Sequence, residues 1–344
     1  MNKASIPSLP LSAERSPWLR GPMRLPGEPL LSALALILAA MARGESVLDT
    51  VSPAPELAAT AEVLRALGAY VAPAGPRWHV QGLGVGGLLT PAGPLPLAET
   101  GAAAPLLIGL IAGHDMEVVL DGPPADPVSE ALLGFLGRNG CRIARDGGQM
   151  RLCGPRFGVP LDLALPAEAA GLVAPLLLNA LVTVGRSRLT LPAGSHDPAI
   201  DLLAAFGARL GAEEDAAGLR LGLEGLAPLR AQALTVPGDP HLAVYPAVAA
   251  LIAPDSELTL SGVALTARGL ALFDALALMG GDIAIGAAQK GGADIVVRHG
   301  GLQGAVIPAE LGIAAEDFPI LCVAAAYAAG DTRFEGLGEG VRRL

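Results

Sequence analysis

The chain has 344 residues, of which 52% are hydrophobic and 3% aromatic, and its formal net charge at pH 7 is −10. This length has room for two domains, whose cores must be built from Ala, Leu, Val and Ile rather than from aromatic rings. The acidic balance excludes a basic surface for nucleic acid, so we expect no nucleic-acid partner.

The mean hydropathy of +0.51 raises the question of a membrane protein. The apolar runs are only about 12–15 residues long, whereas a helix that spans a bilayer needs about 20. Lys3, Arg15, Arg20 and Arg24 precede the first apolar run and together with it imitate a signal peptide. Because that run is also the first member of a series of similar segments, we interpret it as a core helix. We therefore expect a cytoplasmic protein without a membrane association.

Five segments along the chain are apolar almost all round, which is typical of helices buried in a large core. Each is followed by a small residue, a polar residue and an alternating segment that predicts a strand. Their starts lie about 70 residues apart, as in a repeat architecture. The helices are predicted at Leu30–Ala42, Ala102–Ala112, Gly171–Val184, Leu242–Ala253 and Phe318–Ala329. The strands are predicted at Gly44–Thr50, Gly113–Leu120, Gly185–Leu191, Asp255–Leu260 and Gly330–Gly336.

A second helix follows in four of these units and ends each time on a glycine, which supplies the left-handed residue that stops a helix. These glycines are Gly68, Gly140, Gly207 and Gly280. In the fourth unit the second helix is predicted at 267–281 and a strand at Asp282–Ile285. A short edge strand is expected at Pro22–Pro26. The fifth unit reaches Leu344 where its second helix should begin, so we expect an incomplete unit there.

Cysteines and histidines give no sign of a metal site or of another cofactor. Cys141, Cys153 and Cys322 lack the spacing of metal ligands, and the five histidines form no His-x-x-x-His pair. An odd number of scattered cysteines is typical of a reduced cytoplasm. Cys322 lies inside an apolar helix, which predicts that its side chain belongs to the core.

Several segments resemble the EPSP synthase family, the 3-phosphoshikimate 1-carboxyvinyltransferases of the shikimate pathway in aromatic amino acid biosynthesis. They are ATAEVLRALGAYV (59–71), VPGDP with YPAVAALIAP (236–254), LALFDALALMGGDI (270–283) and EDFPILCVAAAYAAGDTRFEGL (316–337). The resemblance covers roughly residues 20–340, in the family's order and spacing. It implies a transferase that moves the enolpyruvyl group from phosphoenolpyruvate to shikimate-3-phosphate.

The resemblance also implies an α/β fold of two domains, built from repeated βαβαββ units with buried helices and outward-facing sheets. The first domain would be discontinuous, at residues 1–26 plus 235–344, and incomplete at its C-terminus. The second would hold three repeat units, at residues 27–234. The chain would then be a divergent and C-terminally truncated member, and the exposed edge of the unfinished unit favours self-association.

In the family, a Lys-Ser-x-Ser-x-Arg run binds both substrates. The sequence of this chain differs from that run. Pro29 and Leu34 occupy the lysine and arginine positions, and Ser32 keeps the second serine. Two further runs of the family lose their cations in PADPVSE (124–130) and at 169–174. Phosphorylated substrates require cationic, bidentate donors, so these losses predict weak binding.

The resemblance leaves a few polar candidates. Gly101 is the one residue kept of an Asn-Ala-Gly-Thr-x-x-Arg run, and Ser195 and Asp197 are kept of a Ser-Arg-Asp-His-Thr-Glu run. With Ser32, these are the substrate-binding candidates. The general-base aspartate of the family's Asp-Glu-Tyr-Pro run is replaced by Glu316, which is followed by Asp317, and these two are the catalytic candidates.

Each candidate also has a structural interpretation, which we favour. Asp197 before Pro198 is typical of a helix N-cap, and two acids at the start of a helix complement its dipole. A glycine at position 101 allows close approach of the backbone. Asp239, His241 and Arg268 are expected to serve in turn, capping or solvated roles at helix starts.

Two functions stay open from the sequence. The first is carboxyvinyl transfer, impaired by the loss of most substrate-binding residues. The second is a non-catalytic pseudoenzyme that acts as a binding or assembly protein. The apolar pattern is intact while the polar ligands have become small or apolar, which favours the loss of catalysis.

Overall fold

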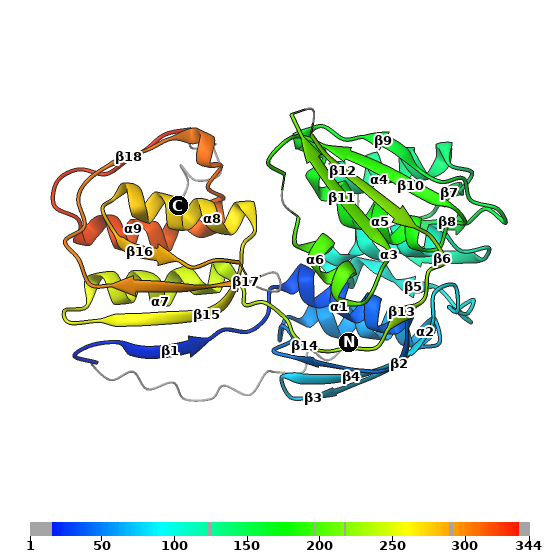
Figure 1. Cartoon of the computed structure of the whole chain (residues 1–344), viewed down its shortest axis with the longest axis horizontal. Coiled ribbons are helices and arrows are strands. Elements are labelled where there is room, and N and C mark those ends of the chain that lie inside the picture. Colours follow the sequence, from blue (N-terminus) through cyan, green and yellow to red (C-terminus); the bar gives the residue numbers. More distant parts are fainter. Residues whose placement is uncertain (1–15, 123–125, 196, 217, 289–291, 337–344) are drawn as a thin grey trace.

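The computed structural model describes residues 16–122, 126–195, 197–216, 218–288 and 292–336, and it has two lobes (Figure 1). The larger lobe extends from α1 to β14, and the smaller lobe contains β1 and the elements from α7 to β19. Each lobe has its own hydrophobic core. Two cores of this kind are the arrangement expected of two domains.

The order helix, strand, helix, strand, strand occurs three times in the larger lobe. The first set is α1 (Pro29–Met41), β2 (Ala42–Asp49), α2 (Pro55–Ala66), β3 (Tyr70–Ala74) and β4 (Arg77–Leu83). The second is α3 (Ala104–Ala112), β6 (Glu117–Asp121), α4 (Pro127–Arg138), β7 (Arg142–Asp146) and β8 (Gln149–Cys153). The third is α5 (Val173–Leu181), β10 (Arg186–Leu191), α6 (Pro198–Ala205), β11 (Leu210–Asp215) and β12 (Gly218–Glu224).

Short elements connect these sets. They are β5 (Leu95–Pro96), the 3₁₀ helix η1 (Leu97–Ala103), β9 (Asp162–Ala164), η2 (Ala167–Leu172), β13 (Leu229–Arg230) and β14 (Ala233–Thr235). The sheets have the strand orders β13-β2-β4-β3 with β14 also on β2, β5-β6-β8-β7, and β11-β12-β10-β9. The third strand of each set pairs with its neighbours in antiparallel fashion, whereas the short strands join in parallel.

The smaller lobe has the same order once more, in α7 (Pro240–Ile252), β15 (Glu257–Ala264), α8 (Ala267–Leu278), β16 (Asp282–Ile285) and β17 (Gly292–Arg298). It continues with β18 (Val306–Ile307), η3 (Ala309–Leu311), η4 (Ala315–Asp317), α9 (Phe318–Tyr327) and β19 (Arg333–Phe334). The predicted edge strand is confirmed as β1 (Arg20–Arg24), which begins two residues earlier than expected and pairs in parallel with β15.

The five predicted apolar helices are confirmed, and all of them begin within two residues of the predicted start. Gly68, Gly140, Gly207 and Gly280 all have positive φ, as the expected helix stops require. Four helices begin with an acid followed by proline, and the acid accepts a hydrogen bond from a backbone N–H of the first turn. The acids are Glu28 for α1, Asp126 for α4, Asp197 for α6 and Asp239 for α7.

In the larger lobe α3 and α5 are buried along their whole length, and α1 is buried after its first two residues. The backbone of α5 approaches α3 so closely that a Cβ on Gly109 would lie 2.2 Å from the Pro175 carbonyl oxygen. In the smaller lobe α9 is different. Cys322 is exposed, so the prediction that it belongs to the core is wrong. The described residues cover one face of α9 and leave the opposite face in solvent.

The chain passes between the lobes twice, and the two crossings are hydrogen-bonded to each other. Gly27 and Gly238 form an isolated antiparallel bridge. The Glu28 N–H donates to the Pro237 carbonyl (2.8 Å), and the Asp239 N–H donates to the Pro26 carbonyl (2.9 Å). The starts of α1 and α7 therefore lie next to each other at the junction of the lobes.

Within the ranges that the structure describes, no helix has the length and hydropathy needed to cross a bilayer. The same residues contain no group of His, Cys, Asp and Glu side chains that is able to hold a metal ion.

Candidate functional site

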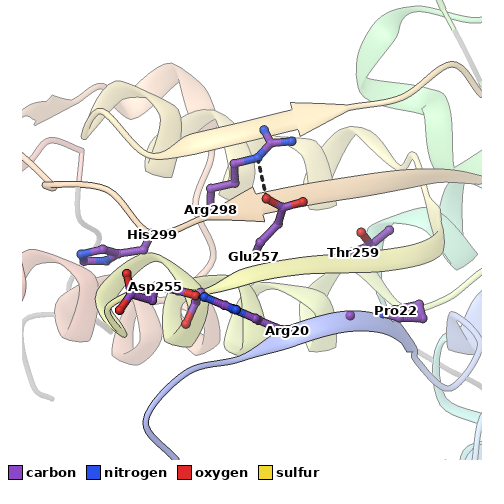
Figure 2. A pocket seen from close by; sticks show the side chains of 9 residues that line it. Arg20, Pro22, Asp255, Glu257, Thr259, Arg298 and His299 are labelled. Carbon is purple, nitrogen blue, oxygen red and sulfur yellow. Dashed lines mark hydrogen bonds and ion pairs between the residues drawn. The ribbon is translucent and has the colours of Figure 1, made fainter.

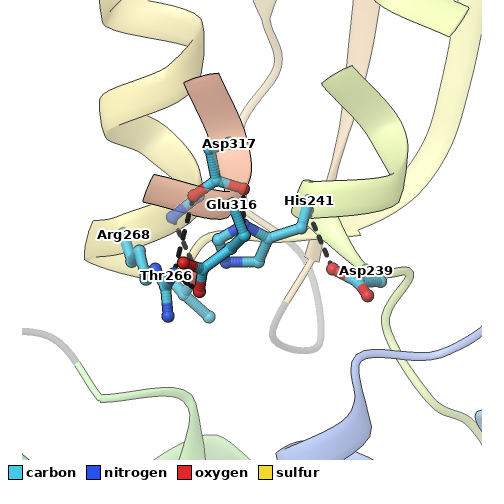
Figure 3. Close-up of polar contacts among 7 residues, drawn as sticks. Asp239, His241, Thr266, Arg268, Glu316 and Asp317 are labelled. Carbon is cyan, nitrogen blue, oxygen red and sulfur yellow. Dashed lines mark hydrogen bonds and ion pairs between the residues drawn. The ribbon is translucent and has the colours of Figure 1, made fainter. Parts of the chain in front are cut away.

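Three helices of the smaller lobe begin at one place, and their polar residues contact one another (Figure 3). His241 lies in the first turn of α7 and Arg268 in the first turn of α8. Glu316 belongs to η4, and Asp317 is the N-cap residue of α9. Each helix start contributes the positive end of its dipole to this place, which favours acidic side chains there.

Asp317 is the centre of these contacts. Its Oδ1 lies 3.1 Å from Nδ1 of His241, and its Oδ2 lies 3.6 Å from the Arg268 guanidinium. The Asp317 side chain is 8% exposed, and its Oδ2 accepts no hydrogen bond from the described residues. A carboxylate this buried depends on charged neighbours, because burial of an unpaired charge is costly. Arg268 and His241 supply those neighbours.

Glu316 is more exposed than Asp317 and forms an ion pair with Arg268. The pKa of the Glu316 carboxyl lies below its usual value, because a backbone N–H donates to it and the Arg268 guanidinium bonds to it. A carboxylate with a lowered pKa is a weaker proton acceptor. The arrangement therefore reduces the ability of Glu316 to act as a general base.

Glu28 brings a further acid close to this group from the start of α1. Its Oε2 accepts a hydrogen bond from the Leu31 N–H at 2.6 Å. Burial is the main cause that raises the pKa of the Glu28 carboxyl, and the charge of Asp239 raises it further while that of His241 lowers it. The Asp239 carboxylate in turn accepts from the His241 N–H at 2.8 Å. We call Glu28, Asp239, His241, Arg268, Glu316 and Asp317 the junction cluster.

The junction cluster is acidic overall. It holds four carboxyl side chains, one guanidinium and one imidazole. Among the described residues, Arg268 is the one guanidinium that a hydrogen bond or ion pair places in the cluster, and both Glu316 and Asp317 already engage it. The cluster is thus suited to positive rather than negative groups.

The positions of the family's lysine and arginine in the first run are unsuited to anions for a separate reason. Leu34 is 2% exposed and packs in the core of the larger lobe, so it does not face a ligand. Pro29 is the first residue of α1 and carries neither a charge nor an N–H.

The predicted substrate-binding residues lie on α1, in η1 and at the start of α6, and each serves its local structure. Ser32 is fully buried, and its Oγ accepts a hydrogen bond from the Ser52 N–H at 3.0 Å. Gly101 has φ +53, which explains a glycine there better than close packing does, because the nearest atom to an added Cβ belongs to the flexible Glu56 side chain. Asp197 caps α6 with a 2.9 Å bond from the Ala199 N–H, and Ser195 lies just before it. Residue 196 lies outside the described residues.

The structure therefore brings together Glu316 and Asp317 but joins them to residues that the sequence favoured for structural roles. His241 and Arg268 are partners of Asp317 rather than isolated helix-start residues, and Glu28 escaped notice altogether. One signal for Glu28 was available, since Glu28-Pro29 repeats the acid-proline pair of Asp239-Pro240. An acid-proline pair predicts a helix cap, but it does not predict which helix starts lie next to each other in the fold.

A separate pocket of about 600 Å³ lies on the sheet of the smaller lobe, away from the junction cluster (Figure 2). Both of its arginines and its histidine already have partners within the protein. Arg298 pairs with Glu257 at 3.3 Å, Arg20 donates to the Asp255 carbonyl at 2.9 Å, and the His299 ring contacts the Leu251 carbonyl at 2.8 Å. We assign no ligand to this pocket.

Comparison with known proteins gives a consistent result. Residues 14–341 match the family model described as EPSP synthase (3-phosphoshikimate 1-carboxyvinyltransferase). A 3-phosphoshikimate 1-carboxyvinyltransferase of Rhodospirillum rubrum is 35% identical over 356 residues, covering 97% of this chain and 78% of the relative. One of Granulibacter bethesdensis is 37% identical over 336 residues, covering 92% of this chain and 73% of the relative.

Solved structures agree in fold. The EPSP synthase of Acinetobacter baumannii superposes with a TM-score of 0.79 at 24% identity, covering 94% of this chain and 76% of that chain. The enolpyruvyl transferase NikO of Streptomyces tendae gives a TM-score of 0.70 at 20% identity, covering 92% of this chain and 75% of that chain. The expected α/β fold of the EPSP-synthase type is confirmed by this match.

Proposed function

The chain belongs to the EPSP synthase family, and we propose that it is a member whose transfer of the enolpyruvyl group from phosphoenolpyruvate to shikimate-3-phosphate is strongly impaired. The proposal has two parts. The family places the chain with enzymes that act on phosphorylated small molecules, and the catalytic candidates Glu316 and Asp317 belong to the junction cluster.

The observation that carries the impairment is the state of Arg268. A phosphate group needs free cationic donors with two-point geometry, and the strongest such donor is a guanidinium. Arg268 is engaged by Glu316 and Asp317, so a phosphate that approached it would meet these two carboxylates first. Like charges repel, so the surroundings of Arg268 disfavour both phosphorylated substrates.

The positions on the larger lobe add to this argument. Ser32 and Asp197 already bond to backbone N–H groups of their own lobe, and Leu34 is part of the core. The binding energy that a phosphate would draw from cationic side chains at positions 29 and 34 in the family is absent here, because these positions hold Pro29 and Leu34. Loss of several charged contacts, each worth about 2–5 kcal/mol when buried, leaves little affinity even if the losses are not additive.

We predict that the purified chain releases phosphate from a mixture of phosphoenolpyruvate and shikimate-3-phosphate at least about a hundredfold more slowly than the Rhodospirillum rubrum relative, a loss of about 2.7 kcal/mol or more in transition-state stabilisation. The measurement is a continuous phosphate-release assay on both proteins, with a thermal melt of the same samples.

The control for the assay is the cooperative melt, which separates an inactive fold from an unfolded chain. Turnover within a hundredfold of the relative contradicts the proposal. In that case Glu316→Gln and Asp317→Asn identify which carboxyl accepts the proton of the attacking hydroxyl, since only the acceptor's variant loses turnover.

A second candidate function is that of a non-catalytic binding or assembly protein, with a cytoplasmic location as the corresponding expectation. The observation that favours it is the uncovered apolar face of the smaller lobe. A chain that neither turns over nor shifts its melting temperature with either substrate supports this candidate over a slow transferase.

A further inference from the structure

Two arginines lie side by side on the outer surface of the larger lobe. The short strand β13 pairs in parallel with β2, and its Arg230 is the register partner of Arg43. The residues just before them, Leu229 and Ala42, are buried in the core of the lobe, so the alternation of the strands directs both arginines away from that core. Both arginines are exposed. We call Arg43 and Arg230 the arginine pair.

Neither guanidinium of the arginine pair has a partner among the residues that the structure describes. Within those residues, the side chains of Arg43 and Arg230 make no hydrogen bond, ion pair or ring contact. The acids nearest to them in sequence, Glu45 and Glu224, are each bonded to another side chain, at 2.8 Å and 3.0 Å. The two positive charges are therefore not balanced by a neighbouring carboxylate.

Such a pair is unfavourable for the sheet by itself. Like charges directly opposite each other on neighbouring strands are destabilising. Acidic residues outnumber basic ones in this chain, 33 to 23, so a carboxylate beside the pair would not require an unusual composition. A cation behind the end of α1 complements the helix dipole, which accounts for Arg43 but not for a second cation next to it. The pair therefore lowers the stability of the sheet, and no described contact offsets this.

The two side chains lie against different neighbours. The Nε of Arg43 is 3.7 Å from the position that a Cβ on Gly84 would occupy, and Gly84 directly follows β4, on the side of β2 opposite to β13. Arg230 lies instead beside Gly207, just after α6, where an added Cβ would be 3.9 Å from its Cγ. Repulsion between the guanidiniums predicts that they do not converge. Because no bond holds either one, both are free to turn toward a ligand between them.

We propose that Arg43 and Arg230 together bind a phosphate group, either as the free ion or as the monoester of a small molecule. Neighbouring strands lie about 4.8 Å apart, so the long side chains of two register partners are able to reach one ligand. A phosphate has oxygens on all sides and accepts paired hydrogen bonds from each guanidinium, whereas a carboxylate presents both of its oxygens on one side. A negative group between the two cations replaces their repulsion by attraction to a shared ion.

The arginine pair lies at the opposite end of α1 from the junction cluster. Helix α1 begins after Glu28 of the cluster, has 13 residues and ends at Met41, two residues before Arg43. At about 1.5 Å per residue, the helix separates the two places by about 20 Å. The pair is thus a separate place for a phosphate group, and it does not depend on whether the junction cluster admits the phosphorylated substrates of the family.

Thermal melts of the full chain in chloride and in inorganic phosphate, at equal ionic strength, test the proposal. Equal ionic strength is needed because any salt screens the repulsion. The larger lobe is followed through its buried Trp78 in a Trp18→Phe background. Phosphate is expected to raise the melting temperature beyond chloride, with half-saturation at about 1–10 mM and a rise of about 3–6 °C at ten times that concentration. Glycerol 3-phosphate, tested in the same way, distinguishes the two sources, since the true ligand class has the lower half-saturation.

Replacing either arginine is expected to have opposite effects in the two buffers. Arg43→Gln and Arg230→Gln remove the like-charge pair, so each is expected to melt higher than the parent in dilute chloride and to need about fivefold more phosphate, or more still, for the same rise. Arg43→Glu is expected to pair with Arg230 and to lose the phosphate effect. Arg186→Gln is the matched control, because Arg186 is also exposed and makes no hydrogen bond or ion pair with the described residues, but its register partner is Glu224. That variant is expected to keep the full phosphate effect.

A phosphate effect no larger than that of chloride, up to about 50 mM, overturns the proposal. So does an effect that persists undiminished in Arg43→Gln and Arg230→Gln, or one that is lost in Arg268→Gln of the junction cluster instead. Arg230→Lys keeps the measurement available if a glutamine variant does not fold, because it retains the charge but not the paired donors, and it is expected to weaken the phosphate effect alone. The readout is stability in phosphate, so the result is independent of whether the chain transfers an enolpyruvyl group.

Discussion

At the scale of single residues, the acids that cap helix starts occupy two kinds of environment. Asp126 and Asp197 cap their helices in exposed or half-buried surroundings, whereas Glu28 and Asp239 cap theirs at the junction of the lobes. By exposure, Asp126, Asp197 and Glu28 are half-buried and Asp239 is buried. Burial nevertheless raises the pKa of the Glu28 carboxyl, whereas hydrogen bonds from Ser129 lower that of Asp126, so the titration of Glu28 should be visible in the stability of the protein.

Glu28→Gln is predicted to be more stable than the parent chain at neutral pH and equally stable in acid. The replacement keeps an oxygen that accepts the Leu31 N–H and removes the charge. A carboxyl whose pKa is higher in the folded than in the unfolded chain contributes its full stabilisation below the unfolded pKa of about 4.3, and loses it as the pH rises through the folded pKa. Urea unfolding of both proteins at about pH 3.5 and pH 7.5 measures the difference.

The matched control is Glu168→Gln, which neutralises an exposed glutamate of the larger lobe. Its difference from the parent is expected to be small and similar at both pH values. A Glu28→Gln variant that is less stable than the parent at pH 7.5 would show that the capping bond outweighs the cost of burying the charge.

At the scale of whole elements, close approach of helices requires small residues at the crossing points. The crossing of α3 and α5 is the tightest example, because the Pro175 carbonyl of α5 lies over Gly109 of α3. A side chain at position 109 must push α3 and α5 apart. Both helices are packed against neighbours in the core, so neither can shift without disturbing other contacts.

Gly109→Ala is predicted to lower the free energy of unfolding by about 1–3 kcal/mol, the range for an overpacked core. Gly134→Ala in α4 is the matched comparison. Gly134 is exposed, and an added Cβ would meet only the end of the Arg138 side chain at 3.8 Å. That variant is expected to raise stability by about 0.4–1 kcal/mol, because alanine favours the helix. Chemical denaturation of the two variants beside the parent checks both signs, and equal effects would contradict the packing argument.

At the scale of the molecule, the two lobes have separate cores of unequal size, joined by two short crossings. Proteins with separate cores commonly unfold in more than one step. The smaller lobe has a helix, α9, with one face in solvent, and an edge strand, β1, that is exposed throughout its length. We therefore expect the smaller lobe to unfold first.

The two tryptophans of the chain allow this order to be measured. Trp18 lies next to β1 of the smaller lobe, where the Leu19 N–H bonds to the Ser256 hydroxyl, and Trp78 is buried in the larger lobe. Fluorescence of Trp78→Phe thus follows the smaller lobe, and fluorescence of Trp18→Phe follows the larger one. The urea midpoint is predicted to be lower in Trp78→Phe than in Trp18→Phe. Coincident midpoints, after correction for the stability cost of each replacement, would mean that the lobes unfold as one unit.

Much of the fold was accessible from the sequence, because the signals that specify it are local. The period of the apolar residues located α1, α3, α5, α7 and α9, and the glycines at 68, 140, 207 and 280 located the ends of the second helices. Which side of a helix is apolar depends only on the residues of that helix. It can therefore be predicted from the sequence without knowing which elements pack against the helix. The same holds for the acid-proline starts, whose hydrogen bonds lie within one turn.

Contacts between distant segments were decided by the tertiary structure alone. Asp317 meets His241 across 76 positions of sequence, and Glu28 comes close to Asp239 only because the two crossings bond to each other at the junction. Cys322 was predicted to be buried from the apolar character of its helix, yet it is exposed because burial depends on what packs against that face. An apolar stripe shows which side of a helix is able to pack against other apolar surfaces. Whether that side is buried depends on how the other elements are arranged around it.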